Sequence, residues 1–350
     1  MKLKTMRRYQ FVLVIIFTFI NLSISGTLVF ITMIYDYRGS EEIYGEYALP
    51  EGSYPRMLQV GQEMVVAYSN GDILLSNIDI DKKKIVDPIT IIPEGGRPML
   101  IKDDKLDRIV CIFNHGGEGN GASIGIAFAP IHNYLNESAW IIRENLLGPV
   151  KQPFRQIGIW EPYLMPIESS HGDYLLFFSN QMEHDPEDPI DSDGYYFEEE
   201  GNKMNQQISV YWVEWNGTAY DTKYAGALSE NIDGKDIFEK DGMASVIQIG
   251  DNSFLATFET FPKMSLGGVV KILKFKISDM GNIETLWRKD LSNDISTAPY
   301  LVEYKNKFVC SYHSNNWDKH GVRLVCMDSD EISISKYTCL SNFPVWWGSL

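Results

Sequence analysis

The chain has 350 residues, of which 44% are hydrophobic and 13% aromatic, so it can build a large core and is not of the disordered class. Its 31 Lys and Arg against 47 Asp and Glu give a net charge of −16, which argues against nucleic acid as a partner, because phosphate binding needs clustered positive charge. Its length is compatible with one large all-β domain.

A membrane-targeting segment opens the chain. Basic residues within the first eight positions precede an apolar stretch from Phe11 to Tyr35. One interpretation is a type II signal anchor. The other is a cleaved signal peptide, with Phe11 to Ile20 as its core, small residues from Ser23 to Ser25 at the cleavage site, and a strand that begins at Thr27. Both interpretations place everything after residue 36 outside the cytoplasm, so we expect a membrane-anchored or secreted protein.

A repeated unit follows the N-terminal segment. Short runs rich in Val, Ile, Tyr, Phe and Leu alternate with clusters of Gly, Asn, Asp and Pro, which is typical of a many-stranded antiparallel fold. Successive units begin with "YPRMLQV", "RPMLIKD", "WEPYLMP", "GMASVIQ" and "APYLVEY", and the fragment "WWGSL" closes the chain. Repeats of several strands at such spacing indicate the blades of a β-propeller.

These patterns predict an all-β protein in three parts. Residues 1–36 form the targeting segment, residues 37–52 a linker or closing strand, and residues 53–350 the propeller. Six starts predict six blades, and because the sixth copy stops at its first strand, a five-bladed ring is the alternative. The loops that enter the innermost strands build one face of such a ring, which is where binding sites form.

The segments "SYPRML", "GIWEPYLMPI", "DGMASVIQIGDNSFLATFET" and "TAPYLVEYKNKFVCSYHSN" resemble glycoside hydrolase family 93, the exo-arabinanases, within the sialidase-like six-bladed propellers. The resemblance runs from about Ser53 to the C-terminus. It implies an exo-acting, retaining glycosidase on extracellular arabinose-type or related glycans, with catalytic glutamates at Glu161 and Glu259. A retaining enzyme pairs an acid/base with a carboxylate nucleophile about 5 Å away. We assign Glu161 as the acid/base and Glu259 as the nucleophile, with the reverse order left open.

Two other functions stay open. Asn180 and Gln181 replace acidic residues that are usual in the family, and Phe113 stands where an arginine is common, which favours a carbohydrate-binding propeller without catalysis. A sialidase is the third candidate, although no intact sialidase box is found and a third arginine, from Arg155 or Arg323, would be needed to hold a carboxylate. In each case the expected partner is an oligosaccharide or polysaccharide.

Further side chains are candidates for substrate binding. Arg56 and Arg97 open consecutive repeats at positions that we take as equivalent, and a guanidinium fork there would hold sugar hydroxyls or a carboxylate. His115 lies in a glycine-rich segment that allows close approach of a ligand. Aromatic or polar groups for stacking and hydrogen bonding are Trp160, Tyr300, Tyr312 and His313.

The remaining expectations concern modification and the cysteines. Asn136 and Asn216 begin N-glycosylation triplets. Cys310 and Cys326 lie in neighbouring strand-like runs and are predicted to pair across a hairpin, with free thiols as the alternative. The cysteine spacing predicts no zinc site.

An acidic insertion over residues 183–200 interrupts the third repeat. Its prolines and charges favour a solvated loop, and no cofactor is predicted beyond the alternative that the loop binds Ca²⁺ through hard oxygen ligands. The ligands would be Asp188, Asp191 and Asp193.

Overall fold

The computed structural model confirms the all-β prediction. It describes residues 27–35, 41–50, 53–79, 84–86, 88–116, 123–148, 156–183, 204–228, 240–261, 268–292, 295–304, 307–316, 319–328 and 334–339. Within these residues the only helical element is one 3-10 turn, η1 (Glu137–Ala139). None of the described residues forms a helix long and apolar enough to cross a membrane.

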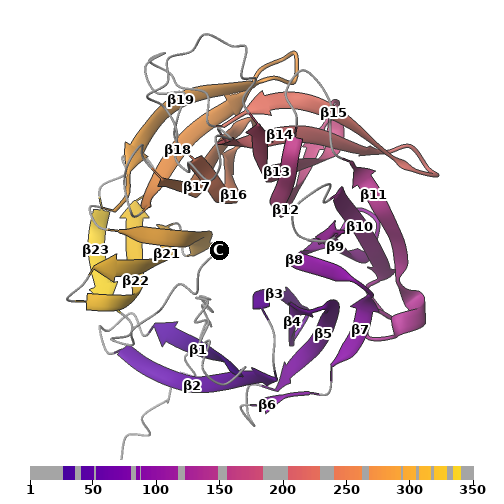
Figure 1. Ribbon diagram of the computed structural model, residues 1–350, viewed down its shortest axis with the longest axis horizontal. Helices are drawn as coiled ribbons and strands as arrows, with labels where there is room; N and C mark the ends of the chain where they lie inside the picture. The colour runs from indigo at the N-terminus through magenta and orange to yellow at the C-terminus, as the bar shows by residue number, and fades with distance from the viewer. Residues whose placement is uncertain are drawn as a thin grey trace, which may run out of the picture.

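The strands form five antiparallel blades around a central axis (Figure 1). The first blade consists of β3 (Ser53–Val60), β4 (Glu63–Asn70), β5 (Asp72–Asp79), β6 (Lys84–Ile85) and β7 (Ile89–Ile92). The second consists of β8 (Gly95–Asp103), β9 (Arg108–His115), β10 (Ser123–Pro130) and β11 (Ile141–Leu147). The third consists of β12 (Gln156–Ser169), β13 (Gly172–Glu183), β14 (Met204–Trp215) and β15 (Tyr220–Ala227).

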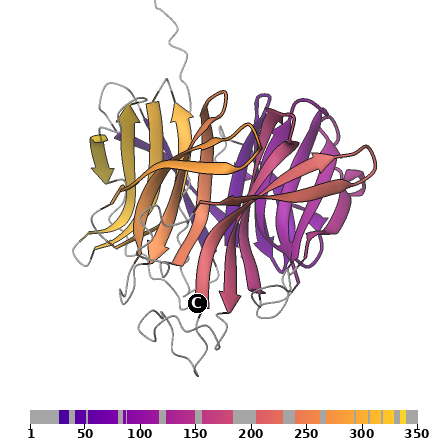
Figure 2. The same cartoon turned by 90° about the horizontal axis from the view of Figure 1, so that it is seen from above.

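The fourth blade consists of β16 (Lys240–Gly250), β17 (Ser253–Phe261), β18 (Val269–Ile277) and β19 (Ile283–Asp290). The fifth consists of β20 (Ser296–Tyr304), β21 (Lys307–Asn316), β22 (Lys319–Asp328) and β23 (Ile334–Cys339). The five-bladed alternative therefore matches the structure, and the sixth start, "WWGSL", lies outside the described residues. Figure 2 shows that the strands run up and down between the two faces of the ring.

A separate hairpin occupies the remaining sector. The strands β1 (Thr27–Tyr35) and β2 (Glu41–Pro50) pair only with each other among the described strands, and β2 contacts β6 of the first blade (Figure 1). A strand over Thr27–Tyr35 agrees with the signal-peptide interpretation, in which a strand begins at Thr27. The anchor and the cleaved signal both remain predictions for the segment before it.

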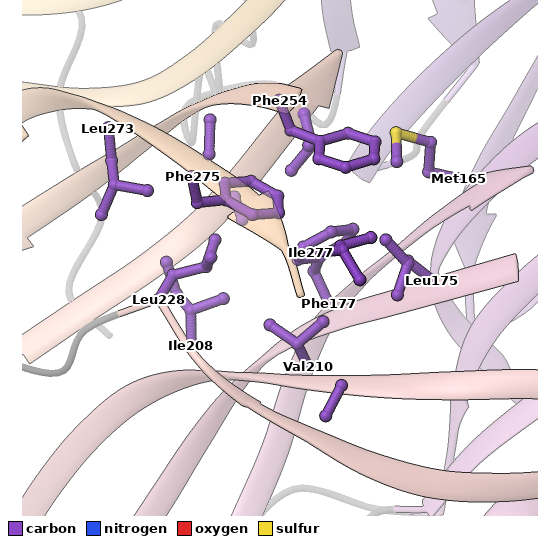
Figure 3. Close-up of a cluster of buried hydrophobic side chains, with 14 of the residues drawn as sticks. Met165, Leu175, Phe177, Ile208, Val210, Leu228, Phe254, Leu273, Phe275 and Ile277 are labelled. Atoms are coloured by element: carbon purple, nitrogen blue, oxygen red, sulfur yellow. The ribbon is translucent and has the colours of Figure 1, made fainter. Parts of the chain in front are cut away.

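The core lies between consecutive blades. The strand sequences carry apolar residues on both faces, and Arg108 to Asn114 of β9 are buried without interruption. We call the interface between two consecutive blades a joint. One hydrophobic cluster fills each joint from the first blade to the fifth. Figure 3 shows the cluster between the third and fourth blades, where the rings of Phe254 and Phe275 stack at 5.0 Å and Phe177 packs edge-on against Phe275.

A β-bulge interrupts the first strand of every blade, and one residue in each bulge has a left-handed backbone. Their φ angles lie between 48° and 56°, namely Tyr54 at 51°, Arg97 at 49°, Glu161 at 55°, Met243 at 52° and Ala298 at 52°. A non-glycine residue in this region costs about 1–3 kcal/mol and is held there by its surroundings, often at functional sites. A bulge also re-aims the side chain that it carries.

We expect Phe177→Ala to destabilise the ring by about 3–5 kcal/mol, because it opens a cavity in the cluster between the third and fourth blades. The free energy of unfolding in urea measures this effect. Met280→Ala is the control, since Met280 is 78% exposed and its truncation should change stability by less than about 0.5 kcal/mol. Equal stability of the two variants would contradict the packing described above.

Candidate functional site

Glu161 lies on the first strand of the third blade, and Glu259 lies on the second strand of the fourth, where it pairs in register with Gly242, the residue before Met243. Glu161 follows Trp160 in the bulge of β12, and its Oε2 accepts hydrogen bonds from Ser179 Oγ at 3.0 Å and from Met243 N at 3.1 Å. Ser179 belongs to the third blade and Met243 to the fourth, so this carboxylate bridges two blades. Glu161 is half-buried, which leaves part of its carboxylate reachable by a ligand.

Glu259 lies at the end of β17 and is 6% exposed. Its Oε2 accepts a hydrogen bond from Ala298 N of the fifth blade at 3.0 Å. Both glutamates thus accept a backbone N–H from the left-handed residue of the following blade. The two carboxylates also both act on the hydroxyl of Tyr54, which places them in one electrostatic environment.

Tyr54, Arg97 and Trp160 form the side of the site opposite these carboxylates. The Arg97 guanidinium lies 5.0 Å from the centroid of the Tyr54 ring and 4.6 Å from that of Trp160, and it hydrogen-bonds to Tyr54. Burial, together with the negative charges of Glu161 and Glu259, raises the pKa of Tyr54 despite the opposing charge of Arg97. Tyr54 is therefore a neutral phenol at physiological pH.

A second layer lies along the same strands, two residues beyond the left-handed positions. It contains Arg56, Tyr163 and Tyr300 from the first, third and fifth blades, and Arg56 interacts electrostatically with both tyrosines and with Glu161. Burial lowers the pKa of Arg56, and burial raises the pKa values of Tyr163 and Tyr300. The hydroxyl of Tyr163 also donates to Val246 O at 2.9 Å, which ties this layer to the fourth blade.

The strand register corrects the expected equivalence of the two arginines. Arg97 occupies the left-handed position of the second blade, whereas Arg56 lies two residues beyond the corresponding position, which is Tyr54. Arg56 therefore belongs to the deeper layer and Arg97 to the layer of the carboxylates. Arg323 lies on β22, the third strand of the fifth blade, where its register partners are Tyr312 of β21 and Cys339 of β23.

Three other candidates lie on the second strands of their blades. His115, at the end of β9, has its Nε2 atom 3.7 Å from Glu144. Tyr312 is 1% exposed and belongs to the hydrophobic cluster between the fourth and fifth blades. His313 occupies in the fifth blade the register position that Glu259 has in the fourth, and its burial lowers its pKa to about 4.

The predicted disulfide is wrong. No disulfide joins Cys310 to Cys326, because Cys310 lies opposite Val325 and Cys326 lies opposite Val309. An offset of one residue directs the two side chains to opposite faces of the blade. Burial raises the pKa of Cys310 to about 12, as expected for an inert thiol.

The predicted glycosylation sites both lie in exposed turns. Asn136 caps η1, and Asn216 accepts hydrogen bonds from Thr218 in the turn between β14 and β15. Their modification remains a prediction. Asp188, Asp191 and Asp193 lie outside the described residues, and across the residues that are described no cluster of three or more His, Cys, Asp or Glu side chains is arranged to hold a metal ion.

The sequence interpretation missed Tyr54, Tyr163, Ser179 and Asn114. A signal for Tyr54 was present, because proline follows the left-handed residue in four blades, at Pro55, Pro98, Pro162 and Pro299. Aligning the repeats on these prolines places Tyr54 beside Arg97 and Glu161. The sequence offers no comparable signal for Ser179 and Asn114, the polar residues on the second strands.

Comparisons with known proteins bear on the fold. No protein-family model and no curated protein matches the chain. A solved structure of a protein of unknown function from Dyadobacter fermentans is similar, with a TM-score of 0.55 and 12% identity over 83% of each chain. An endo-arabinase from Bacteroides thetaiotaomicron has a TM-score of 0.47 and 10% identity, over 77% of this chain and 92% of that one. An exo-1,5-alpha-L-arabinanase from a bovine ruminal metagenomic library has a TM-score of 0.48 and 8% identity, over 80% and 95%.

The chain is thus a β-propeller with a polar site at its axis. The Dyadobacter similarity concerns the fold alone, and membership of glycoside hydrolase family 93 remains a prediction.

His313 should make stability depend on pH. The unfolded chain binds a proton at this residue below about pH 6.5, whereas the folded protein binds it only below about pH 4. Stability therefore falls as the pH drops from 6.5 to 4, by up to about 3 kcal/mol from this group. Urea unfolding at pH 7 and pH 4.5 measures the loss, and His313→Gln should reduce it. An identical pH dependence in the two proteins would contradict the burial of a neutral imidazole.

Proposed function

We propose that this protein is an exo-acting, retaining glycoside hydrolase on arabinose-type or related extracellular glycans. The observation that carries the proposal is that Glu161 and Glu259, from different blades, both act electrostatically on the hydroxyl of Tyr54, and that each accepts the N–H of the left-handed residue in the following blade. Paired carboxylates at a sugar site supply the acid/base and the nucleophile of glycoside cleavage. The N-terminal segment, as anchor or cleaved signal, would deliver the propeller to the outside of the cell.

The hydrogen bonds support one assignment of the two roles. Glu161 Oε2 accepts two donors, which stabilise a negatively charged oxygen and suit a nucleophile. Glu259 is 6% exposed, and burial favours the protonated form of a carboxyl, which suits the group that carries the proton to the leaving oxygen. This order reverses the assignment made from the sequence. In it, Glu161 attacks the anomeric carbon while Glu259 protonates the departing glycosidic oxygen, and Glu259 then activates the water that releases the sugar.

The charge balance supports a neutral sugar as substrate. Arg56 and Arg97 offset Glu161 and Glu259, while Tyr54 and His313 are uncharged at neutral pH. Arg97, which lies over the rings of Tyr54 and Trp160, offers hydrogen-bond donors to sugar hydroxyls.

The first test is hydrolysis of linear arabinan and of aryl glycosides by the chain and by its Glu161→Gln and Glu259→Gln variants. Loss of a carboxylate that acts in the transition state should lower kcat by about 10³-fold or more in each. Azide added to Glu161→Ala should yield a glycosyl azide of inverted configuration, and added to Glu259→Ala one of retained configuration. Turnover that survives both glutamine variants would refute the proposal. A folded chain that binds glycans but cleaves none would instead be a carbohydrate-binding propeller.

A sialidase-type mechanism is the second candidate, since Tyr54 adjoins two glutamates and could attack as a tyrosine nucleophile. The raised pKa of Tyr54 argues against it. The Tyr54→Phe variant distinguishes the glutamate mechanism from the tyrosine mechanism. The glutamate mechanism predicts a raised KM with kcat within about tenfold of the parent, because only a hydrogen bond of about 1 kcal/mol is lost. Complete loss of turnover, with activity on sialosides in the parent, would establish the tyrosine as the nucleophile.

A further inference from the structure

Asn114 contacts the backbone on both sides of Trp160. It lies near the end of β9 in the second blade and is 4% exposed. Its Nδ2 donates to Ile159 O at 2.7 Å, and its Oδ1 accepts from Glu161 N at 3.2 Å. One side chain of the second blade therefore makes two hydrogen bonds to the bulge of the third blade, from which Glu161 projects.

The position of Asn114 recurs in other blades. The strand register aligns it with Ser179 of the third blade and Glu259 of the fourth. Ser179 Oγ accepts from Met243 N at 3.3 Å, and Glu259 Oε2 accepts from Ala298 N at 3.0 Å. In each joint, a polar side chain on a second strand accepts the N–H of the left-handed residue in the next blade. Asn114 does this for Glu161 and adds a second bond to Ile159.

Glu161 needs such a restraint. Its φ of 55° is unfavourable for a residue with a Cβ, and a proline follows it, which restricts its backbone further. In this backbone conformation the carboxylate accepts hydrogen bonds from Ser179 Oγ and Met243 N. A relaxed bulge would turn the side chain away from both donors.

We propose that Asn114 is the positioning residue for Glu161, and that it fixes the reactive direction of the carboxylate across the joint between the second and third blades. The inference rests on the proposed function for its consequence in catalysis. Its structural part, the hold on Glu161, is independent of any activity.

The kinetic test compares Asn114→Ala and Asn114→Ser with Tyr134→Phe. Asn114→Ala should lower kcat by about 10²-fold with KM within about threefold, because misplacing a reacting group by about 1 Å has an effect of this size. Asn114→Ser places at this position the residue found at Ser179, and should recover part of the loss. Tyr134→Phe is the matched control, since the Tyr134 hydroxyl also joins two blades, through Glu63 Oε2 at 2.6 Å. It should lose stability and keep its kcat.

A second measurement separates this inference from the proposed function. Crystal structures of the parent, of Asn114→Ala and of Tyr134→Phe are compared at Glu161. We expect Glu161 to leave the left-handed region, and its carboxylate to lose the bonds to Ser179 Oγ and Met243 N, in Asn114→Ala alone. An unchanged φ at Glu161 in folded Asn114→Ala would overturn the positioning role. Absence of turnover in the parent, with Glu161 displaced in Asn114→Ala, would refute only the glycosidase.

Discussion

An antiparallel sheet with two apolar faces cannot cover either face by itself, and from the first blade to the fifth the facing sides of consecutive blades cover each other. The clusters between consecutive blades contain the largest buried side chains of the molecule, such as Trp212, Phe177 and Phe254. Burial of this apolar area is the main force that holds the blades at a fixed angle. That fixed angle brings the first strands together, and the site at the axis exists because they meet there.

The joints also explain why strained residues surround the axis. Each bulge turns one residue into the left-handed region, and a side chain of the preceding blade accepts its N–H where Glu161, Met243 and Ala298 are concerned. The fourth and fifth blades place Met243 and Ala298 at this position, and their N–H groups hold the two carboxylates. The first three blades place reactive or polar side chains there. One repeated backbone feature thus presents polar side chains in the first three blades and supplies hydrogen-bond donors to the carboxylates in the last two.

The sequence allowed the repeat and the all-β class to be recognised, because strand alternation and blade starts are local patterns. Glu161 and Glu259 were assigned through the family resemblance, and their catalytic roles remain a prediction. It did not reveal which residues of different repeats are equivalent. Arg56 and Arg97 both lie beside a proline, but Arg97 precedes Pro98 while Arg56 follows Pro55, and this difference of two residues separates the layers. The cysteine pairing failed for a related reason, since an offset of one residue reverses the face. Contacts across the joints, such as that of Asn114, depend on the packing angle and leave no local pattern.

The deeper layer connects the charges of the site with the packing of the ring. Arg56 interacts electrostatically with Glu161 and with tyrosine hydroxyls of the first, third and fifth blades. Removing one member of a buried pair leaves the other charge uncompensated, which is more costly than losing the pair itself. Arg56 thereby offsets the negative charge of Glu161. Because these partners come from three blades, the same electrostatic interactions help to hold the inner strands of the ring together.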